Sequence, residues 1–304
     1  MSLQTTARSG NSRVFKMPTL TVFTPTYNRK KLLKRVYKSL TMQTNDDFMW
    51  LITDDGSDDG TREEVESFIK EGLVNIKYIY QENGGKMRAH NRGVIECETP
   101  LFVCLDSDDY FTKNAVDDII TEWEKISVND RIAGIIAHKG TDEVHTLYGA
   151  RFPDNENTTL KGLYERGFKG ETTLVFKTEV IKRYLFPEIP GEKYVPEDYV
   201  YDKIDRDHEF VILPRILTVC ELVSSGYTDA VERLRRENPT AWFLYYGQRV
   251  SNTRMSVLRI KYAAHFLRFE KRAQKQYRKL AGIPLYMRLT GLPFAALLFI
   301  RGKL

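Results

Sequence analysis

LFVCLDSDD, residues 101–109, joins an apolar run to a cluster of carboxylates. The apolar run is typical of a short buried strand. Because side chains alternate between the two faces of an extended chain, we expect Asp106 and Asp108 to point to the same side and share one partner, while Ser107 faces away. Their oxygen atoms suit a hard divalent cation, Mg²⁺ or Mn²⁺. The alternative is that DSDD only caps a following helix, since Asp and Ser favour N-cap positions.

Three apolar runs precede this strand, and each also ends in polar residues. TLTVFT (residues 19–24) leads into PTYN, FMWLIT (48–53) into DDGSDDGT, and VNIKYIY (74–80) into ENGGK. Strands that alternate with helical periodicity predict an α/β fold with a mostly parallel, Rossmann-like sheet flanked by helices. In such sheets ligands bind beyond the carboxyl ends of the strands, so we expect the polar clusters to converge on one cleft.

The domain organisation follows from length and composition. The 304 residues are 42% hydrophobic and 29% charged, as in an ordinary globular protein. Residues 1–16 are polar and are expected to be disordered. The α/β domain is expected to cover residues 17–228, and residues 229–304 are expected to form a helical, basic C-terminal region.

The positive charge is concentrated at the C-terminal end. Residues 231–304 contain 16 Lys plus Arg against 3 Asp plus Glu, a balance of +13, which leaves −8 for the rest of the total of +5. A basic region of this kind suits anionic lipid or nucleic acid, or is simply a solvated face. The apolar run from Leu289 to Ile300 is shorter than the roughly twenty residues that a bilayer requires. It could lie at a membrane interface, or pack on the α/β domain or a second subunit.

The three cysteines are odd in number, widely spaced and set among apolar residues. They therefore predict neither a disulfide framework nor a zinc site, and they favour a reducing, cytoplasmic compartment. The five histidines show no metal-ligand spacing either.

Two further carboxylate pairs are candidates for binding or chemistry. Asp54 and Asp55 follow an apolar strand, where a carboxylate can accept hydrogen bonds from a nucleobase imide or a ribose hydroxyl. The alternative there is an ordinary acidic turn. Glu197 and Asp198 follow a proline at the expected start of a helix, where the helix dipole alone also favours acidic residues.

The order and spacing of PTYNR, DDGSDDGT, NGGK with AHNRGV, and DSDD resemble those of family 2 glycosyltransferases of the GT-A fold. The resemblance covers roughly residues 18–225. It implies an inverting enzyme that transfers a sugar from a nucleotide-sugar, usually UDP-linked, to a glycan or lipid-linked acceptor. It also implies a divalent metal, Mn²⁺ or Mg²⁺, a nucleotide-binding half at residues 17–110 and an acceptor half at residues 111–228.

The resemblance carries over to individual residues. It assigns Asp198 as the general base with Glu197 beside it, and Asp108, together with Asp106, as the metal ligands. Residues expected to bind the donor or its nucleotide are Thr24, Pro25, Tyr27, Asp54, Asp55, Asn83, Lys86, Arg88, Asp106 and Ser107.

The departures from the family pattern limit the kinds of glycosyltransferase that we expect. The run KMRAHNRG differs from the family's usual segment, so the roles of Lys86 and Arg88 could be exchanged. The Gln-x-x-Arg-Trp signature is absent, which argues against a processive polymer synthase. We expect a hexosyl- or N-acetylhexosaminyltransferase of surface polysaccharide biosynthesis, at the inner face of the membrane, that could form a homodimer.

The competing hypothesis is a non-catalytic protein that binds nucleotides or nucleic acid through the basic C-terminal region. Phosphate-backbone binding has no need of the carboxylates in DSDD, so no nucleic acid is expected as a partner. A dehydrogenase is excluded because no Gly-x-Gly-x-x-Gly follows the first strand.

Overall fold

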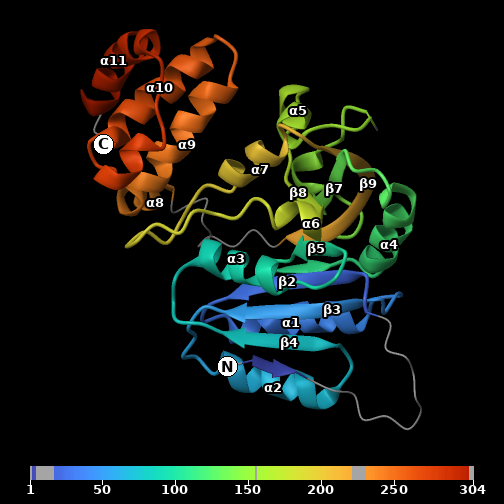
Figure 1. Ribbon diagram of the computed structural model, residues 1–304. Coiled ribbons are helices and arrows are strands. Elements are labelled where there is room, and N and C mark those ends of the chain that lie inside the picture. Colours follow the sequence, from blue (N-terminus) through green and yellow to red (C-terminus); the bar gives the residue numbers. More distant parts are fainter. Residues whose placement is uncertain (1, 5–16, 155, 221–230, 301–304) are drawn as a thin grey trace. The chain divides into compact units, whose positions relative to one another are not determined.

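A computed structural model of the chain describes residues 2–4, 17–154, 156–220 and 231–300. Its internal contacts divide the chain into two compact units (Figure 1). The N-terminal unit comprises Met1–Leu185 and Tyr201–Val223, and the C-terminal unit comprises Phe186–Val200 and Ser224–Leu304. The boundary expected at residue 228 is therefore close, but residues 186–200 group with the C-terminal unit instead of with the α/β domain.

The described part of the N-terminal unit is built on a mixed sheet with the strand order β1-β4-β3-β2-β5-β8-β7-β9-β6. The strands, in chain order, are β1 (Ser2–Gln4), β2 (Leu20–Thr26), β3 (Phe48–Asp54), β4 (Ile76–Tyr80), β5 (Leu101–Cys104), β6 (Asp109–Phe111), β7 (Ile132–Gly140), β8 (Thr172–Lys177) and β9 (Glu209–Cys220).

The expected α/β fold is confirmed, with a parallel group of strands in the first half and one parallel pair, β7 with β9, in the second half. Strands β4, β3, β2 and β5 pair in parallel, as the alternation of strands and helices predicted. In the second half, β8 runs antiparallel to both β5 and β7, and β6 runs antiparallel to β9. The sheet as a whole is therefore mixed instead of mostly parallel.

The expectation of a disordered N-terminus differs from the structure at its first residues. Ser2–Gln4 forms β1, which pairs antiparallel with β4. The remainder of the segment expected to be disordered, residues 5–16, lies outside the described residues.

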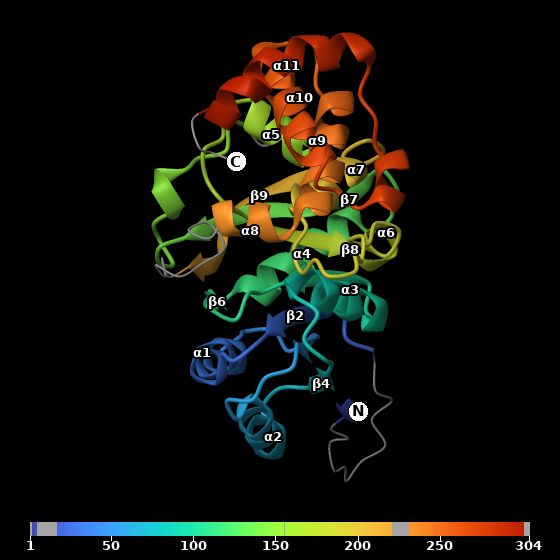
Figure 2. The ribbon, with the colours of Figure 1, turned by 90° about the vertical axis from the view of Figure 1, so that its left-hand side faces the viewer.

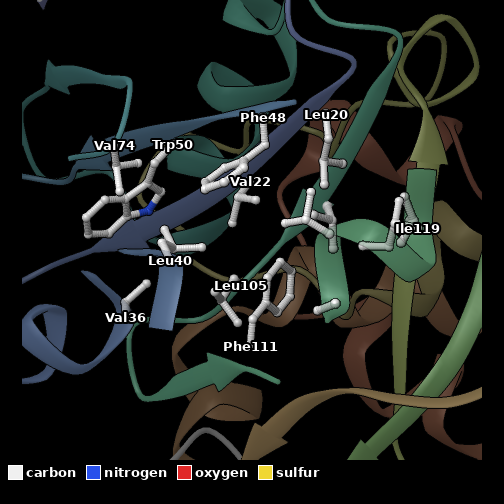
Figure 3. Packing of buried hydrophobic residues seen from close by; sticks show 14 of the residues in the cluster. Leu20, Val22, Val36, Leu40, Phe48, Trp50, Val74, Leu105, Phe111 and Ile119 are labelled. Carbon is white, nitrogen blue, oxygen red and sulfur yellow. The ribbon is translucent and has the colours of Figure 1, made fainter. Parts of the chain in front are cut away.

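Helices cover both faces of the parallel strands (Figures 1 and 2). Helices α1 and α2 share a hydrophobic cluster with β2 and β3 on one face, and α3 packs against β2 and β3 on the other. Figure 3 shows Val22 and Trp50 packed towards Val36 and Leu40 of α1. The helices of this unit are α1 (Lys30–Thr41), α2 (Thr61–Glu71), α3 (Lys86–Glu96), α4 (Ala115–Ile126), η1 (Leu147–Gly149), α5 (Leu160–Glu165) and α6 (Thr178–Ile181), with most of α7 (Asp198–Ile204).

The opposite face of β2 shows why α3 lies close to the sheet. Phe23 is fully buried, and a Cβ atom added at Gly93 of α3 would lie 2.2 Å from its ring. Only glycine therefore fits at this contact. Since α3 begins at Lys86, this packing also fixes where the Gly-rich loop before the helix is placed.

The described helices of the C-terminal unit are α8 (Val231–Glu237), α9 (Pro239–Asn252), α10 (Val257–Glu270), η2 (Lys275–Lys279) and α11 (Leu285–Ile300), which confirms the helical expectation. Their shared core includes Phe243 and Phe266, whose ring centroids are 4.6 Å apart, and Gly291, which lets α11 approach Ala263. No helix in the described ranges combines the length and the apolar character that a membrane span requires.

Candidate active site

The loops that follow β2 and β3 are tied together by their own polar groups. The backbone N–H of Asn28 donates to Ser57 Oγ at 2.8 Å, and the N–H of Asp58 donates to Asn28 Oδ1 at 2.9 Å. Thr24 and Pro25 are buried within β2, and Thr24 Oγ1 accepts a hydrogen bond from Trp50 Nε1 at 2.9 Å. The Thr24 side chain is thus used inside the sheet, whereas Tyr27 is exposed and accessible.

Asp54 and Asp55 are buried, and both organise the surrounding loops. Asp54 accepts hydrogen bonds from Tyr78 Oη at 2.7 Å and from the N–H of Ser57 at 2.8 Å. Burial and then the hydrogen bond to Asp54 raise the pKa of Tyr78, so the phenol stays protonated and remains the donor. The acidic pair is therefore part of the built loop structure.

Asp55 holds the Gly-rich loop that precedes α3. Its carboxylate accepts from the N–H of Gly84 at 2.9 Å, from the N–H of Gly85 at 2.7 Å and from Gln81 Nε2 at 2.7 Å. The side-chain amide of Asn83 donates to the carbonyl oxygen of Asp55 at 2.8 Å. These hydrogen bonds hold the Gly-rich loop against the end of β3.

The structure brings Lys86 to the DSDD turn. Lys86 Nζ lies 2.9 Å from Asp106 Oδ1. Burial by itself would raise the pKa of Asp106, but the charges of Lys86 and then Lys139 outweigh it and lower the pKa to about 2. Asp106 is therefore ionised throughout the neutral range.

Asp106 and Asp108 have different protein partners, and the chain between them is not extended. Strand β5 ends at Cys104, and the chain turns at Ser107 and Asp108, where the N–H of Asp109 donates to the carbonyl of Asp106 at 3.0 Å. Asp108 pairs with Arg29 at 2.7 Å instead. Because of this turn, strand alternation does not set the directions of the two side chains. Both carboxylates are partly exposed, and Ser107 is buried.

Three basic residues at this turn were not predicted. Arg29 neutralises Asp108, Arg35 donates to the Asp108 carbonyl, and Lys139 of β7 lies 3.0 Å from the buried Asp109. The PTYNR motif contains Arg29, so the alternating polar loops offered a signal for it. Lys139 lies within an apolar strand and far along the chain, and nothing local marks it.

The remaining donor candidates lie around the Gly-rich loop. A Cβ atom added at Gly84 would lie 2.4 Å from Arg88 Cδ, which places the Arg88 side chain directly against the loop backbone. The loop before α3 and the first turn of the helix therefore carry the remaining donor candidates, together with the glycine that Arg88 contacts: Asn83, Gly84, Lys86 and Arg88. The expected convergence of the loops after β2, β3, β4 and β5 on one region is present.

Glu197 and Asp198 belong to the other unit. Both are exposed at the start of α7, and Asp198 forms an ion pair with Arg249 of α9. Both partners lie within the C-terminal unit. The structure therefore gathers the donor candidates in one unit and the expected base in the other.

The donor set at the DSDD turn fits a hard divalent cation. In the described ranges no group of three or more His, Cys, Asp or Glu side chains could hold a metal by itself. Mg²⁺-like ions are commonly bound by one or two carboxylates together with substrate phosphates and water. Asp106 and Asp108, both partly exposed and one of them ionised down to about pH 2, supply such a pair.

Curated relatives match parts of this chain. A validoxylamine A glucosyltransferase of Streptomyces hygroscopicus subsp. jinggangensis (strain 5008) is 41% identical over 95 residues, 30% of this chain and 22% of that protein. The GalNAc(5)-diNAcBac-PP-undecaprenol beta-1,3-glucosyltransferase of Campylobacter jejuni is 25% identical over 205 residues, 64% of this chain and 62% of that enzyme. The chain spans less than two thirds of the length of either relative.

Solved structures share the fold. Residues 1–349 of S. aureus TarS in complex with UDP-GlcNAc match with a TM-score of 0.58 and 18% identity, over 90% of this chain and 79% of that chain. The mannosyltransferase PcManGT of Pyrobaculum calidifontis in complex with GDP-Man and Mn²⁺ matches with a TM-score of 0.55 and 15% identity, over 95% of this chain and 83% of that chain. These likenesses show a GT-A type of fold.

The family itself is shown by a longer match. The sequence pattern of glycosyl transferase family 2 matches residues 21–185, which is more than half of the chain and includes all four polar loops of the N-terminal unit. On this evidence the chain belongs to glycosyl transferase family 2.

Proposed function

We propose that this protein is an inverting glycosyltransferase that transfers a hexosyl or N-acetylhexosaminyl group from a UDP-sugar to a glycan or lipid-linked acceptor. The observation that carries the proposal is the pair of carboxylates, Asp106 and Asp108, which form ion pairs with Lys86 and Arg29 beyond the carboxyl ends of the parallel strands. The UDP-GlcNAc complex of TarS and the lipid-linked acceptor in the name of the Campylobacter relative support this choice of substrates.

The residues of the donor site would act by binding and by charge. The exposed Tyr27 ring would lie against the nucleobase, and the loop held by Asp55 would present Lys86 and Arg88 to the diphosphate. Asp106 and Asp108 would hold a divalent cation, Mn²⁺ or Mg²⁺, which when bound stabilises the added negative charge of the nucleoside diphosphate leaving group. The Mn²⁺ of the PcManGT complex supports that assignment.

The acceptor hydroxyl needs a base, because an alcohol is a poor nucleophile at neutral pH. We assign this role to Asp198, whose carboxylate would accept the hydroxyl proton as the acceptor oxygen bonds to the anomeric carbon and the diphosphate departs. Glu197 lies beside it in sequence and is also exposed. Phosphate-backbone binding would explain neither carboxylate, so a non-catalytic nucleic-acid-binding protein is the weaker hypothesis.

The test is calorimetric titration of UDP, GDP and a panel of UDP-sugars with and without Mn²⁺. Wild type should bind UDP in a metal-dependent manner, and Asp108→Asn should abolish that dependence. Asp117→Asn, which removes an exposed carboxylate on α4, is the matched control and should bind like wild type. A chain that binds no nucleoside diphosphate under any metal condition would contradict the proposed function.

We further propose that the C-terminal unit holds the enzyme at an anionic membrane surface, at the inner face of the membrane. Leu285, Leu289 and Leu292 lie on one side of α11 and are 72%, 61% and 53% exposed. The preceding η2 segment presents the exposed cations Lys275 and Lys279. Apolar side chains flanked by basic ones are the pattern of a helix that lies in a membrane interface.

Flotation with vesicles of anionic phospholipid tests the membrane contact. The full chain should float at low salt, and the double variant Leu289→Asp with Leu292→Asp should remain at the bottom. Leu73→Asp changes a leucine of similar exposure in the N-terminal unit and is the matched control. If the full chain never floats and instead forms a dimer that the double variant dissociates, the apolar side of α11 binds a second copy and not lipid.

A further inference from the structure

The segment that carries Glu197 and Asp198, residues 186–200, is fastened to the start of α9. The Glu192 carboxylate accepts from the backbone N–H groups of Thr240 and Ala241, both at 2.8 Å, and so caps the helix. In return, Asn238 Oδ1 accepts from the N–H groups of Lys193 and Tyr194 at 2.8 and 3.0 Å. The backbone that leads to the carboxylates is therefore anchored without any help from the carboxylates themselves.

One turn before its end, α9 makes a second set of contacts with the same segment. Gln248 Nε2 donates to the Tyr199 carbonyl at 3.0 Å, and the neighbouring Arg249 donates through its guanidinium to Asp198 Oδ2. The Arg249 side chain is 12% exposed, whereas the Asp198 side chain is 52% exposed. A well-fixed cation thus holds one oxygen of a carboxylate that remains open to solvent.

Arg249 is itself held by Tyr245. Its Nε donates to Tyr245 Oη at 3.1 Å, and its guanidinium carbon lies 5.2 Å from the centroid of the Tyr245 ring. Both contacts restrain the planar guanidinium, which can then restrain the plane of the carboxylate that it binds. A lysine at this position could supply the charge but not the planar geometry.

We propose that Arg249 is the positioning residue for Asp198: it fixes one carboxylate oxygen so that the other faces the acceptor hydroxyl. This inference rests on the proposed function, in which Asp198 is the base. Since the segment is already anchored through Glu192, Asn238 and Gln248, the ion pair is not required to hold the backbone, and orientation of the carboxylate is what it adds. The basic C-terminal unit would thereby take part in the chemistry.

The test measures UDP release from UDP-glucose and UDP-GlcNAc, with water and simple alkyl glycosides as acceptors. Arg249→Met should lower kcat by about 10- to 100-fold, the size expected when a reacting group loses its orientation. The KM for the donor and the affinity for UDP should change less than about twofold, and Arg249→Lys should recover part of the loss. Arg259→Met, which removes an arginine that donates to the Val250 carbonyl in the same unit, should leave kcat unchanged.

A double-mutant cycle separates positioning from a general structural effect. If Arg249 acts through Asp198, then Arg249→Met should have no further effect on kcat in a background that already carries Asp198→Asn. Independent losses that multiply in the double variant, an equal loss in Arg259→Met, or a lower melting temperature that accounts for the loss would overturn the proposal.

Failure of the proposed function gives a different result. If Asp198→Asn releases UDP at the wild-type rate, Asp198 is not the base and the role of Arg249 falls with it. If wild type releases no UDP from either donor with any acceptor, the proposed function itself is contradicted. If UDP binding is normal and Arg249→Met lowers kcat by the same factor in the wild-type and the Asp198→Asn backgrounds, only the positioning role of Arg249 is contradicted.

Discussion

Replacing Lys139 with methionine should destabilise the N-terminal unit strongly. Lys139 and Asp109 form an ion pair at 3.0 Å, with side chains that are 18% and 8% exposed. Burial alone would lower the pKa of Lys139, but Asp109 and Asp106 outweigh it and raise the pKa, so the lysine stays charged. Burial raises the pKa of Asp109 against the effect of Lys139. Each charge therefore depends on the other.

The magnitude follows from the burial of the pair. Removing one partner of a buried ion pair leaves an uncompensated charge and typically costs about 3–5 kcal/mol. For a unit of this size each kcal/mol lowers the melting temperature by roughly 2–4 °C, so the fall should be about 6–20 °C. Exchanging both residues for apolar ones, as in Asp109→Leu with Lys139→Met, should restore most of the loss, because buried pairs contribute little beyond an apolar replacement.

Differential scanning calorimetry at neutral pH measures both effects, and titration with UDP and Mn²⁺ reports on the site. Lys139 also lowers the pKa of Asp106, and Asp109 is both the last residue of DSDD and the first residue of β6. The single variant should therefore bind UDP more weakly as well. If Lys139→Met melts within about 2 °C of wild type, the two charges do not depend on each other. The same conclusion follows if the double variant is less stable than either single variant.

Three further predictions concern the loop before α3, the helix behind it and the C-terminal unit. Asp55→Asn should cost about 3 kcal/mol by removing the charged acceptor of the Gly84 and Gly85 N–H groups, and should weaken UDP binding in calorimetry while Asp58→Asn does not. Gly93→Ala should cost about 1–3 kcal/mol through its clash with the Phe23 ring, measured by urea unfolding. Burial, with Arg235 and Arg268, lowers the pKa of His265 to about 4. The unfolded chain therefore binds a proton between pH 6.5 and 4 that the folded chain does not, so the free energy of unfolding should fall by about 2 kcal/mol from pH 7 to pH 5. Urea titrations at both pH values measure this loss, and His265→Phe should largely remove it.

The predicted acidic residues show what a local sequence pattern can and cannot predict about a site. The sequence indicated that Asp54 and Asp55 lie at the end of a strand, and they do. It could not indicate that Asp55 accepts hydrogen bonds from Gly84 and Gly85, because these partners are 29 and 30 residues further along the chain. In the sequence, a carboxylate that binds a nucleobase cannot be distinguished from one that accepts hydrogen bonds from backbone N–H groups.

The DSDD turn shows a second limit. Alternation of side chains holds only while the chain stays extended, and β5 ends two residues before Asp106. The separate partners of Asp106 and Asp108, Lys86 and Arg29, come from the starts of two different helices. Their meeting depends on how α1 and α3 pack on opposite faces of the sheet.

By itself the sequence determined the strands and helices of the first half of the N-terminal unit, their parallel pairing and the loops that carry the polar residues. Apolar periodicity, strand length and turn residues act over a few positions, so they can be recognised without knowledge of the fold. Only the tertiary structure decided that Lys139 compensates Asp109, and that residues 186–200 join the C-terminal helices through Glu192, Asn238 and Arg249. These contacts join residues 30 to 51 positions apart, and long-range pairing is chosen by the packing of whole elements and not by any local pattern.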